Sequence, residues 1–348
     1  MGLRRLFNLV LGAALAACLT AAAPAADPGR IVAIGDLHGD YEAWRKILLA
    51  AKLTDASGKW TGGAATLVQT GDITDRGPDS LKIIRHMMVL QRQAPRAKGN
   101  VVILLGNHEA MNVIGDLRYV SAGEYAAFAD DKSAARRDTL FANNKALIED
   151  FYRKRNASMS PAAIRGAWMA TMPLGKAEHQ AAWRPAGELG QWAIALPAVV
   201  KLGGTLFVHG GISAPYAALP IEEINRRAAA ALAAADSSET AIISDPMGPL
   251  WYRGLIARKA TGEAPQTPSR ALPGEPRSAS IDEQLTTALG AYVARRMVIG
   301  HTPVLSGIEI TNNGRLIRID TGISQAYGGK LSYLEILGDD VRPHEVAR

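Results

Sequence analysis

The sequence predicts an α/β fold built from repeated strand–helix units, with one helical insertion. Two observations support this class. Short apolar runs recur along the chain, and each ends in a glycine next to an aspartate, asparagine or histidine. Between two groups of these runs, residues 115–197 are rich in alanine, arginine, glutamate and aromatic residues and look helical. Since parallel crossovers place the strand ends at one edge of a sheet, the residues that follow the runs are expected to converge there.

The first unit starts with a β-rich run at residues 30–34, which is followed by Asp36 and His38. These two residues are two positions apart on a turn, so both can face one ion. A carboxylate with an imidazole suits Mn, Fe, Zn or Co better than Ca, which takes oxygen ligands. Asp40 is interpreted as the cap of a helix over residues 41–51 rather than as a ligand.

The second unit carries the central candidate residue. The run that starts at Leu67 leads through Gly71 to Asp72, the predicted shared ligand of two metal ions, and a helix is expected over residues 79–93. A glycine–aspartate turn after a strand is common and usually structural. Its repetition at other strand ends in this chain favours a ligand role.

Three further apolar runs end in ligand residue types: 101–105 before Asn107 and His108, 205–208 before His209, and 296–299 before His301. The wholly apolar run at 101–105 is typical of a parallel strand that is buried on both faces. A lone histidine after a strand is usually structural. Several of them at equivalent strand ends favour metal ligation.

The insertion and the C-terminal part are predicted with less detail. Helices are expected at 124–128, 134–155 and 160–172, and a loop at 173–185. The insertion is expected to lie over the site and to determine substrate choice. His179, flanked by Glu178 and Gln180, is predicted to be exposed.

Residues 264–278 are rich in proline, glycine and serine and are expected to form a mobile surface loop. The runs at 308–311, 316–319 and 331–336 are predicted as hairpin strands of a second sheet. Asp320 and Tyr327 stand where they could line the site. The predicted organisation is a signal peptide at 1–26, a metal-binding domain at 27–114 and 198–348, and the insertion at 115–197.

The N-terminal segment predicts export from the cytoplasm. Arg4 and Arg5 precede an apolar run, which is the pattern of a signal peptide. Cleavage after Ala25 would give a soluble periplasmic protein. Alternatively, the residues before Cys18 resemble a lipoprotein box, and lipidation of this cysteine would attach the protein to a membrane.

The composition limits the remaining possibilities. Hydrophobic residues make up 48% of the 348 residues, which is enough for a large core. The formal net charge is +6, and the basic residues are scattered, so no nucleic-acid partner is expected. Since Cys18 is the one cysteine of the chain, no disulfide can form within it.

Five motifs stand in order along the chain: GDLHGD, GDITDRG, GNHEA, HGGIS and GHTP. In this order they resemble the motifs of the calcineurin-like metallophosphoesterase superfamily, and specifically its PPP-type phosphoprotein phosphatases. The GNHEAMN, GDLRYV and GPLWYRG segments and the insertion are most similar to the Shewanella-like branch. The resemblance covers residues 31–333 and implies a four-layer α-β-β-α metallophosphoesterase sandwich.

The resemblance also implies two metal ions, Mn, Fe or Zn, and a role for each motif residue. Asp36, His38 and Asp72 would hold one ion, and Asp72, Asn107, His209 and His301 the other. The implied reaction is in-line attack of a metal-bridging hydroxide on a phosphomonoester, with His108 as the general acid and Asp75 as its orienting partner. Arg76, Asn107 and Arg253 would bind the phosphate.

Substrate and activity stay open at this stage. The resemblance implies a phosphorylated protein as substrate, but the same site could hydrolyse small phosphoesters or diadenosine polyphosphates beneath a different cap. An inactive envelope protein that binds metal is the alternative from another class, although every expected catalytic position is filled. Eukaryotic Ser/Thr phosphatases carry their second phosphate-binding arginine in a block that this sequence lacks. Phosphoserine, phosphothreonine and phosphotyrosine are therefore all open.

Overall fold

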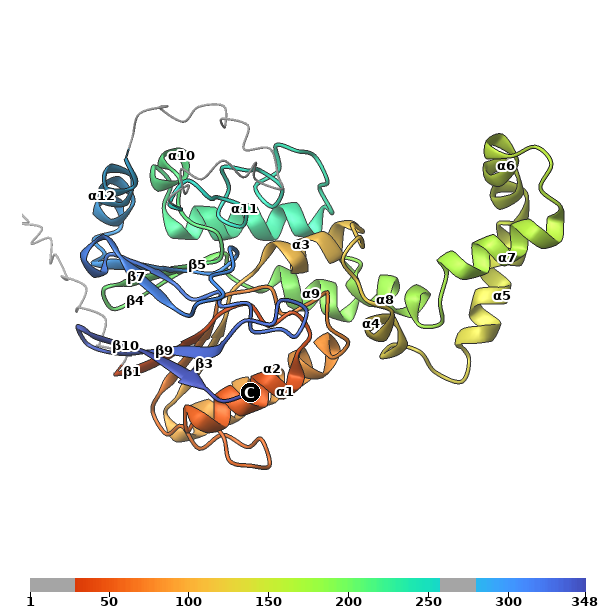
Figure 1. Cartoon of the computed structure of the whole chain (residues 1–348). Helices are drawn as coiled ribbons and strands as arrows, with labels where there is room; N and C mark the ends of the chain where they lie inside the picture. Colours follow the sequence, from red (N-terminus) through yellow and green to blue (C-terminus); the bar gives the residue numbers. More distant parts are fainter. Residues whose placement is uncertain (1–28, 257–279) are drawn as a thin grey trace, which may run out of the picture.

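The computed structural model describes residues 29–256 and 280–348, in which two five-stranded sheets pack face to face between helices (Figure 1). The first sheet has the strand order β10-β9-β1-β2-β3. Its strands are β1 (Arg30–Ile34), β2 (Thr66–Gln69), β3 (Asn100–Ile103), β9 (Leu331–Leu337) and β10 (Asp340–Val346). Strands β1, β2 and β3 run parallel to one another, as the three predicted strand–helix units require.

The second sheet has the strand order β4-β5-β6-β8-β7. Its strands are β4 (Val199–Leu202), β5 (Thr205–Val208), β6 (Arg296–Ile299), β7 (Glu309–Thr311) and β8 (Leu316–Arg318). Strands β5, β6 and β8 are parallel, whereas β4 and β7 pair antiparallel at the two edges. Each sheet thus brings three parallel strand ends to the same edge of the sandwich.

Helices cover the outer face of each sheet (Figure 1). The first sheet is covered by α1 (Tyr41–Ala50) and α2 (Ser80–Gln93), and the second by α10 (Ala214–Ala217), α11 (Ile221–Ala233) and α12 (Ile281–Ala291). As predicted, the Asp40 carboxylate caps α1 by accepting the Ala43 backbone N–H at 2.9 Å. This four-layer α-β-β-α arrangement confirms the predicted fold class.

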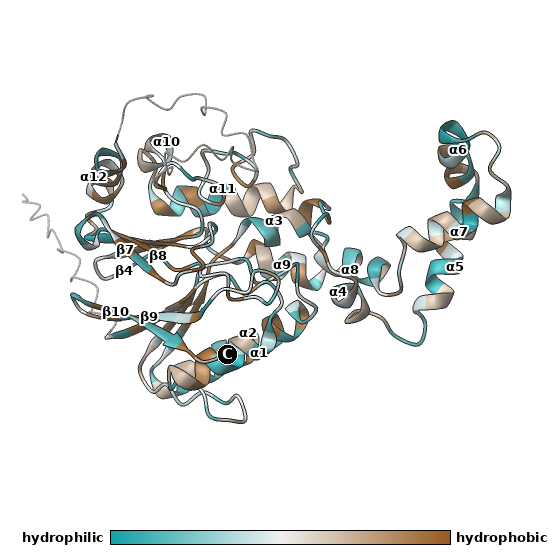
Figure 2. Cartoon of the chain, in the orientation of Figure 1, coloured by the Kyte–Doolittle hydropathy of each residue, from teal (hydrophilic) through white to brown (hydrophobic). Residues whose placement is uncertain are grey.

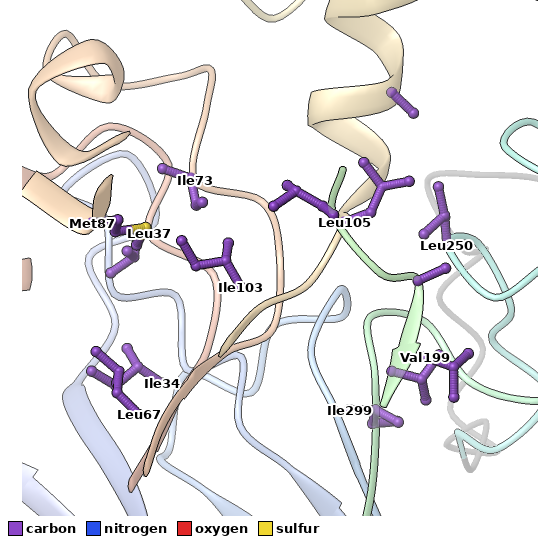
Figure 3. Packing of buried hydrophobic residues seen from close by; sticks show 14 of the residues in the cluster. Ile34, Leu37, Leu67, Ile73, Met87, Ile103, Leu105, Val199, Leu250 and Ile299 are labelled. Carbon is purple, nitrogen blue, oxygen red and sulfur yellow. The ribbon is translucent and has the colours of Figure 1, made fainter. Parts of the chain in front are cut away.

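Strand β1, at the centre of the first sheet, is buried on both faces because its side chains alternate between two cores. Ile31 and Ala33 join a cluster made of residues from both sheets, which fills the space between them. Val32 and Ile34 join the cluster that includes the covering helices. Figure 3 shows part of that second cluster. Figure 2 shows hydrophobic residues concentrated on the strands between the helical layers.

The helical segment between β3 and β4 leaves the body of the molecule and returns to it (Figure 1). It contains α3 (Asn107–Ile114), α4 (Ala122–Ala126), α5 (Ser133–Asn143), α6 (Lys145–Arg155), α7 (Pro161–Thr171), α8 (Lys176–Trp183) and α9 (Glu188–Ile194). Helices α3 and α9 lie against the sandwich, α4 and α8 lie next to them at the base of an arm, and α5, α6 and α7 project outward as that arm (Figure 1). None of the helices in the described ranges has the length and apolar character needed to cross a membrane.

Three predictions about this part of the chain and the last strands were wrong. The predicted loop at 173–185 contains α8, because its two prolines flank the helix instead of interrupting it. His179 is fully buried in α8, since its sequence neighbours point to other sides of the helix. The run at 331–336 forms β9, which pairs with β1 in the first sheet, because alternation predicts a strand but not its partner.

Some sequence predictions lie outside the described residues. These are the signal peptide at 1–26, with Cys18 and Ala25, and the whole of the loop at 264–278. They stay predictions.

Candidate metal centre

The loops that follow the parallel strands meet at one edge of the sandwich and bring the predicted residues together. Each of these residues is nearly fully buried, with an exposed fraction between 0% and 6%. They are Asp36 and His38 after β1, Asp72 after β2, Asn107 and His108 at the start of α3, His209 after β5, His301 after β6 and Asp320 after β8.

Asp72 lies at the centre of this group. Its Oδ2 is 3.7 Å from Nε2 of His38 and 3.8 Å from Nε2 of His108, while its Oδ1 is 3.3 Å from Nε2 of His209. The carboxylate therefore belongs to two separate groups of possible metal ligands, each made of Asp72 and two histidines. One consists of His38, Asp72 and His108, and the other of Asp72, His209 and His301; in each, the possible ligand atoms lie within 4.8 Å of one another.

The backbone around Asp72 requires glycine at two positions that are far apart in the sequence but adjacent in space, Gly71 and Gly106. Gly71 has a φ of 95°, which side-chain-bearing residues rarely adopt. A Cβ on Gly106 would lie 2.2 Å from the Asp72 nitrogen and 2.3 Å from its Oδ1. These glycines let the β2 and β3 loops approach closely enough for His108 N–H to donate to Asp72 Oδ1 at 3.0 Å.

Hydrogen bonds to backbone carbonyls orient two of the histidines. His38 Nδ1 lies 2.9 Å from the Thr74 oxygen, and His209 Nδ1 lies 2.8 Å from the Thr70 oxygen. A carbonyl only accepts, so each Nδ1 carries a proton and each Nε2 is directed at Asp72. His209 Nε2 also lies 2.9 Å from Asn107 Oδ1, so this atom faces two acceptors.

The electrostatics of the group fit bound cations. Burial raises the pKa of Asp36 well above its ordinary value, and the nearby Asp320 and Asp72 raise it further. Burial also raises the pKa of Asp320 to about 6. Burial and the neighbouring His108 lower the pKa of His38 to about 3, which favours the neutral, ligating imidazole. Cations at this position would relieve the repulsion among the carboxylates.

Two further observations agree with this fit. His301 Nε2 is buried and has no hydrogen-bond partner within the described ranges. The His209 Nε2, placed among the Asp72 and Asn107 oxygens, needs either a proton or a cation. Asp36 belongs to neither of the two groups; its Oδ2 accepts the His301 backbone N–H at 3.0 Å.

His108 and Asp75 form a buried pair at the candidate metal site. His108 Nδ1 lies 2.5 Å from Asp75 Oδ2, and Asn112 donates to the other Asp75 oxygen at 3.0 Å. Burial alone would lower the pKa of His108, but the Asp72 and Asp75 carboxylates outweigh burial and raise the pKa overall. The pair therefore holds an imidazole that keeps its proton more readily than usual.

Two arginines and three aromatic residues complete the site. The Arg76 guanidinium stands between two rings, with its Cζ 4.7 Å from the Tyr119 ring centroid and 4.9 Å from that of Tyr327. The Trp251 ring meets His301 edge-on at 5.7 Å. Burial lowers the pKa of Arg253, and the Asp72 and Asp36 carboxylates oppose that shift, so the Arg253 charge interacts with these two carboxylates.

Sequence reasoning gave Glu109 no role, yet it holds the Asp72 loop in place. Its carboxylate accepts four backbone N–H groups, from Asp72, Ile73, Thr74 and Gly106, at 2.8 to 3.2 Å. The available signal was a glutamate in the first turn of a helix directly after the GNH residues. Asn112 was missed as well, and only its spacing of four residues from His108 hinted at a shared helix face.

Comparisons with known proteins agree with this geometry. The family model described as calcineurin-like phosphoesterase matches residues 29–246. The chain is 32% identical to Shewanella-like protein phosphatase 2 of Arabidopsis thaliana over 321 residues, which covers 90% of this chain and 76% of the relative.

Two other matches concern the fold and a part of the chain. The solved cold-active protein tyrosine phosphatase of a psychrophilic Shewanella species has a similar fold, with a TM-score of 0.61 and 24% identity over 92% of this chain and 80% of that one. The symmetrical bis(5'-nucleosyl)-tetraphosphatase of Photorhabdus laumondii is 35% identical over 107 residues, which is 31% of this chain and 30% of that protein.

Proposed function

Because the chain belongs to the calcineurin-like phosphoesterases, in their Shewanella-like protein phosphatase branch, it is a hydrolase, and we propose that it removes phosphate from phosphorylated proteins. The observation that supports this most directly is the juxtaposition at Asp72. Two groups of possible metal ligands share its carboxylate, His108 of the first group is paired with Asp75, and the Arg76 charge acts on His38 and His108.

The residues that would hold two metal ions are Asp36, His38 and Asp72 for one, and Asp72, Asn107, His209 and His301 for the other. Two such ions, when bound, lower the pKa of a coordinated water and neutralise phosphate oxygens. The buried carboxylates and neutral imidazoles form a donor set that suits Mn, Fe or Zn. Metal analysis of the purified protein tests which of these ions it contains.

The remaining roles fall to side chains beside the ligands. His108 gives its proton to the oxygen of the departing alcohol or phenol, and Asp75 fixes the orientation of the imidazole through Nδ1. Arg76 presents a planar fork to two phosphate oxygens, and its two tyrosine neighbours restrict its motion. Arg253, whose charge acts on Asp72 and Asp36, adds positive charge to the site.

A second candidate function is hydrolysis of small phosphoesters or dinucleoside polyphosphates. The partial similarity to a bis(5'-nucleosyl)-tetraphosphatase favours it, but that match covers only 31% of this chain. The inactive metal-binding alternative does not agree with membership in a hydrolase family.

The test compares kcat/KM of the purified protein with Mn on phosphoserine, phosphothreonine and phosphotyrosine peptides and on diadenosine tetraphosphate. The expected result is faster turnover of at least one phosphopeptide. Faster turnover of the dinucleotide would reject the proposed function in favour of the second candidate.

We also propose that the protein is exported, on the N-terminal pattern alone. Mass spectrometry of the mature N-terminus distinguishes a chain that starts after Ala25 from one that starts with a lipidated Cys18. A mature protein that keeps Arg4 and Arg5 would contradict export.

A further inference from the structure

The part of the helical segment between α3 and the end of the first turn of α4 lies directly on the loop that carries Asp75 and Arg76. We call residues 119–124, which precede and open α4, the clamp segment. Ser121 Oγ donates to the Gly77 oxygen at 3.0 Å, and a Cβ on Gly123 would lie 2.5 Å from Pro78 Cβ. The clamp segment is therefore in close contact with the loop along its length.

The loop needs such support because its backbone is unfavourable. Asp75 and Arg76 have φ values of 71° and 66°, and two consecutive non-glycine residues in the left-handed region are uncommon. Such a backbone conformation persists only where the surrounding structure holds it. Two side chains of the site depend on this backbone: the Asp75 carboxylate, which contacts His108, and the Arg76 guanidinium, which stacks on two tyrosines.

Two acceptors of the clamp segment hold the two strained peptide groups. Glu124 Oε2 accepts the Asp75 N–H at 3.1 Å, and the Tyr119 backbone oxygen accepts the Arg76 N–H at 2.9 Å. Glu124 is fully buried, although glutamate is rarely found so unless it is paired. Its other oxygen faces His179 of α8, with 3.9 Å between Oε1 and Nε2.

We propose that Glu124 is a positioning residue for the phosphatase reaction: it fixes the Asp75 backbone, so that the Asp75 carboxylate reaches His108. This assignment rests on the proposed function. Burial and the nearby Asp75 charge raise the pKa of Glu124 well above its ordinary value, which favours the neutral carboxyl. Glutamine keeps the size and the accepting oxygen of that neutral form, and it is therefore the conservative replacement.

The test uses two substrates that differ in how much they need a proton on the leaving group. One is the phosphopeptide that the parent protein hydrolyses best, and the other is 4-nitrophenyl phosphate, whose leaving group is a much weaker base. Losing the orientation of His108 slows the first substrate more than the second, because only the first depends strongly on a general acid.

Glu124→Ala and Glu124→Asp are expected to lower kcat on the phosphopeptide by ~10-fold or more, and on 4-nitrophenyl phosphate by a clearly smaller factor. The Glu124→Asp variant keeps a carboxyl group, but its side chain is too short to reach the Asp75 N–H. It provides the same test if the alanine variant does not fold. Glu124→Gln is expected to retain the parent kcat on both substrates within ~3-fold. Glu178→Ala, which removes a carboxylate of α8 that contacts Ser133 and Arg136, is the control and leaves both values unchanged.

Equal losses on both substrates would indicate a merely structural role and overturn the assignment, as would no loss at all. A glutamine variant as impaired as the alanine variant would overturn it too. A parent protein that hydrolyses neither substrate would instead reject the proposed function, and the assignment with it.

Discussion

The strand-end loops and the α5–α7 arm (residues 133–171) have opposite relations to solvent. In the loops, the candidate ligands are at most 6% exposed, and backbone carbonyls hold the Nδ1 atoms of His38 and His209. In the arm, α6 has no buried residue and Leu147 is 73% exposed. Ion pairs four residues apart, such as Lys154 with Asp150, support α6 from within.

The difference shows what each region needs from its sequence. A site that binds cations and moves a proton needs charges at fixed distances in a dry environment, so it depends on long-range packing. A helix held by its own hydrogen bonds and ion pairs tolerates exchange of its exposed side chains. Changes of the same chemical kind should therefore have very different effects in the two regions.

The largest effect is expected from Asp72→Asn. The substitution removes the charge shared by both groups of ligands, so kcat on a phosphopeptide should fall by more than ~100-fold. Metal content, measured by inductively coupled plasma mass spectrometry, should fall in parallel. Asp55→Asn, an exposed aspartate in a surface turn, is the control and should change neither value. Parent-level activity in the Asp72 variant would refute the shared-ligand role.

The second effect is expected from His108→Asn, which removes the proton donor but keeps a polar side chain. The kcat on a phosphopeptide should fall by about 100-fold, and by less on 4-nitrophenyl phosphate. Metal content should stay at the parent value. Since His108 lies within 4.8 Å of the His38 and Asp72 ligand atoms, a fall in metal content would instead assign it to the ligands.

The third effect concerns pH and the base of the arm. His179 is packed against Tyr125, Phe128 and Trp183, and burial lowers its pKa to about 4. The unfolded chain takes up this proton near pH 6.5 and the folded chain only near pH 4, so stability falls as the pH drops between these values.

The expected loss from this residue is at most about 2 kcal/mol between pH 7 and pH 5. Urea unfolding at both pH values, in the parent and in His179→Leu, measures it. The leucine variant should lose less stability on acidification than the parent. An identical loss in both proteins would show that His179 does not contribute.

The sequence predicted the parts of the fold that local chemistry determines. The apolar runs before Asp36, Asp72 and Asn107 gave β1, β2 and β3, because strands buried on both faces must be apolar throughout. Strands β4 and β10 were missed. They are edge strands with exposed polar residues such as Lys201 and Arg342, and they lack that pattern.

The supporting residues of the site were missed for a different reason. Glu109 and Glu124 act on backbone groups 36 and 49 residues away in the sequence, at Ile73 and Asp75. No spacing rule links such partners, because only the packing of the helices on the loops brings them together. The role of a buried glutamate such as Glu109 can be recognised only once the fold is known. A candidate ligand that follows a strand and a glycine, such as Asp72, can be recognised in the sequence.

The smallest effect on stability and activity is expected from a substitution in the arm. This substitution serves as the control for the comparison between the arm and the site. Leu147→Ser should change the free energy of unfolding by less than ~0.5 kcal/mol and leave kcat unchanged, because the leucine is already in water. Ile164→Ala in α7 removes a fully buried side chain of the same arm and should cost about 2 kcal/mol or more. Denaturant unfolding measures both, monitored by far-UV circular dichroism. A large loss in the Leu147 variant would mean that this face of α6 is covered in solution, and the contrast between arm and site would then have to be abandoned.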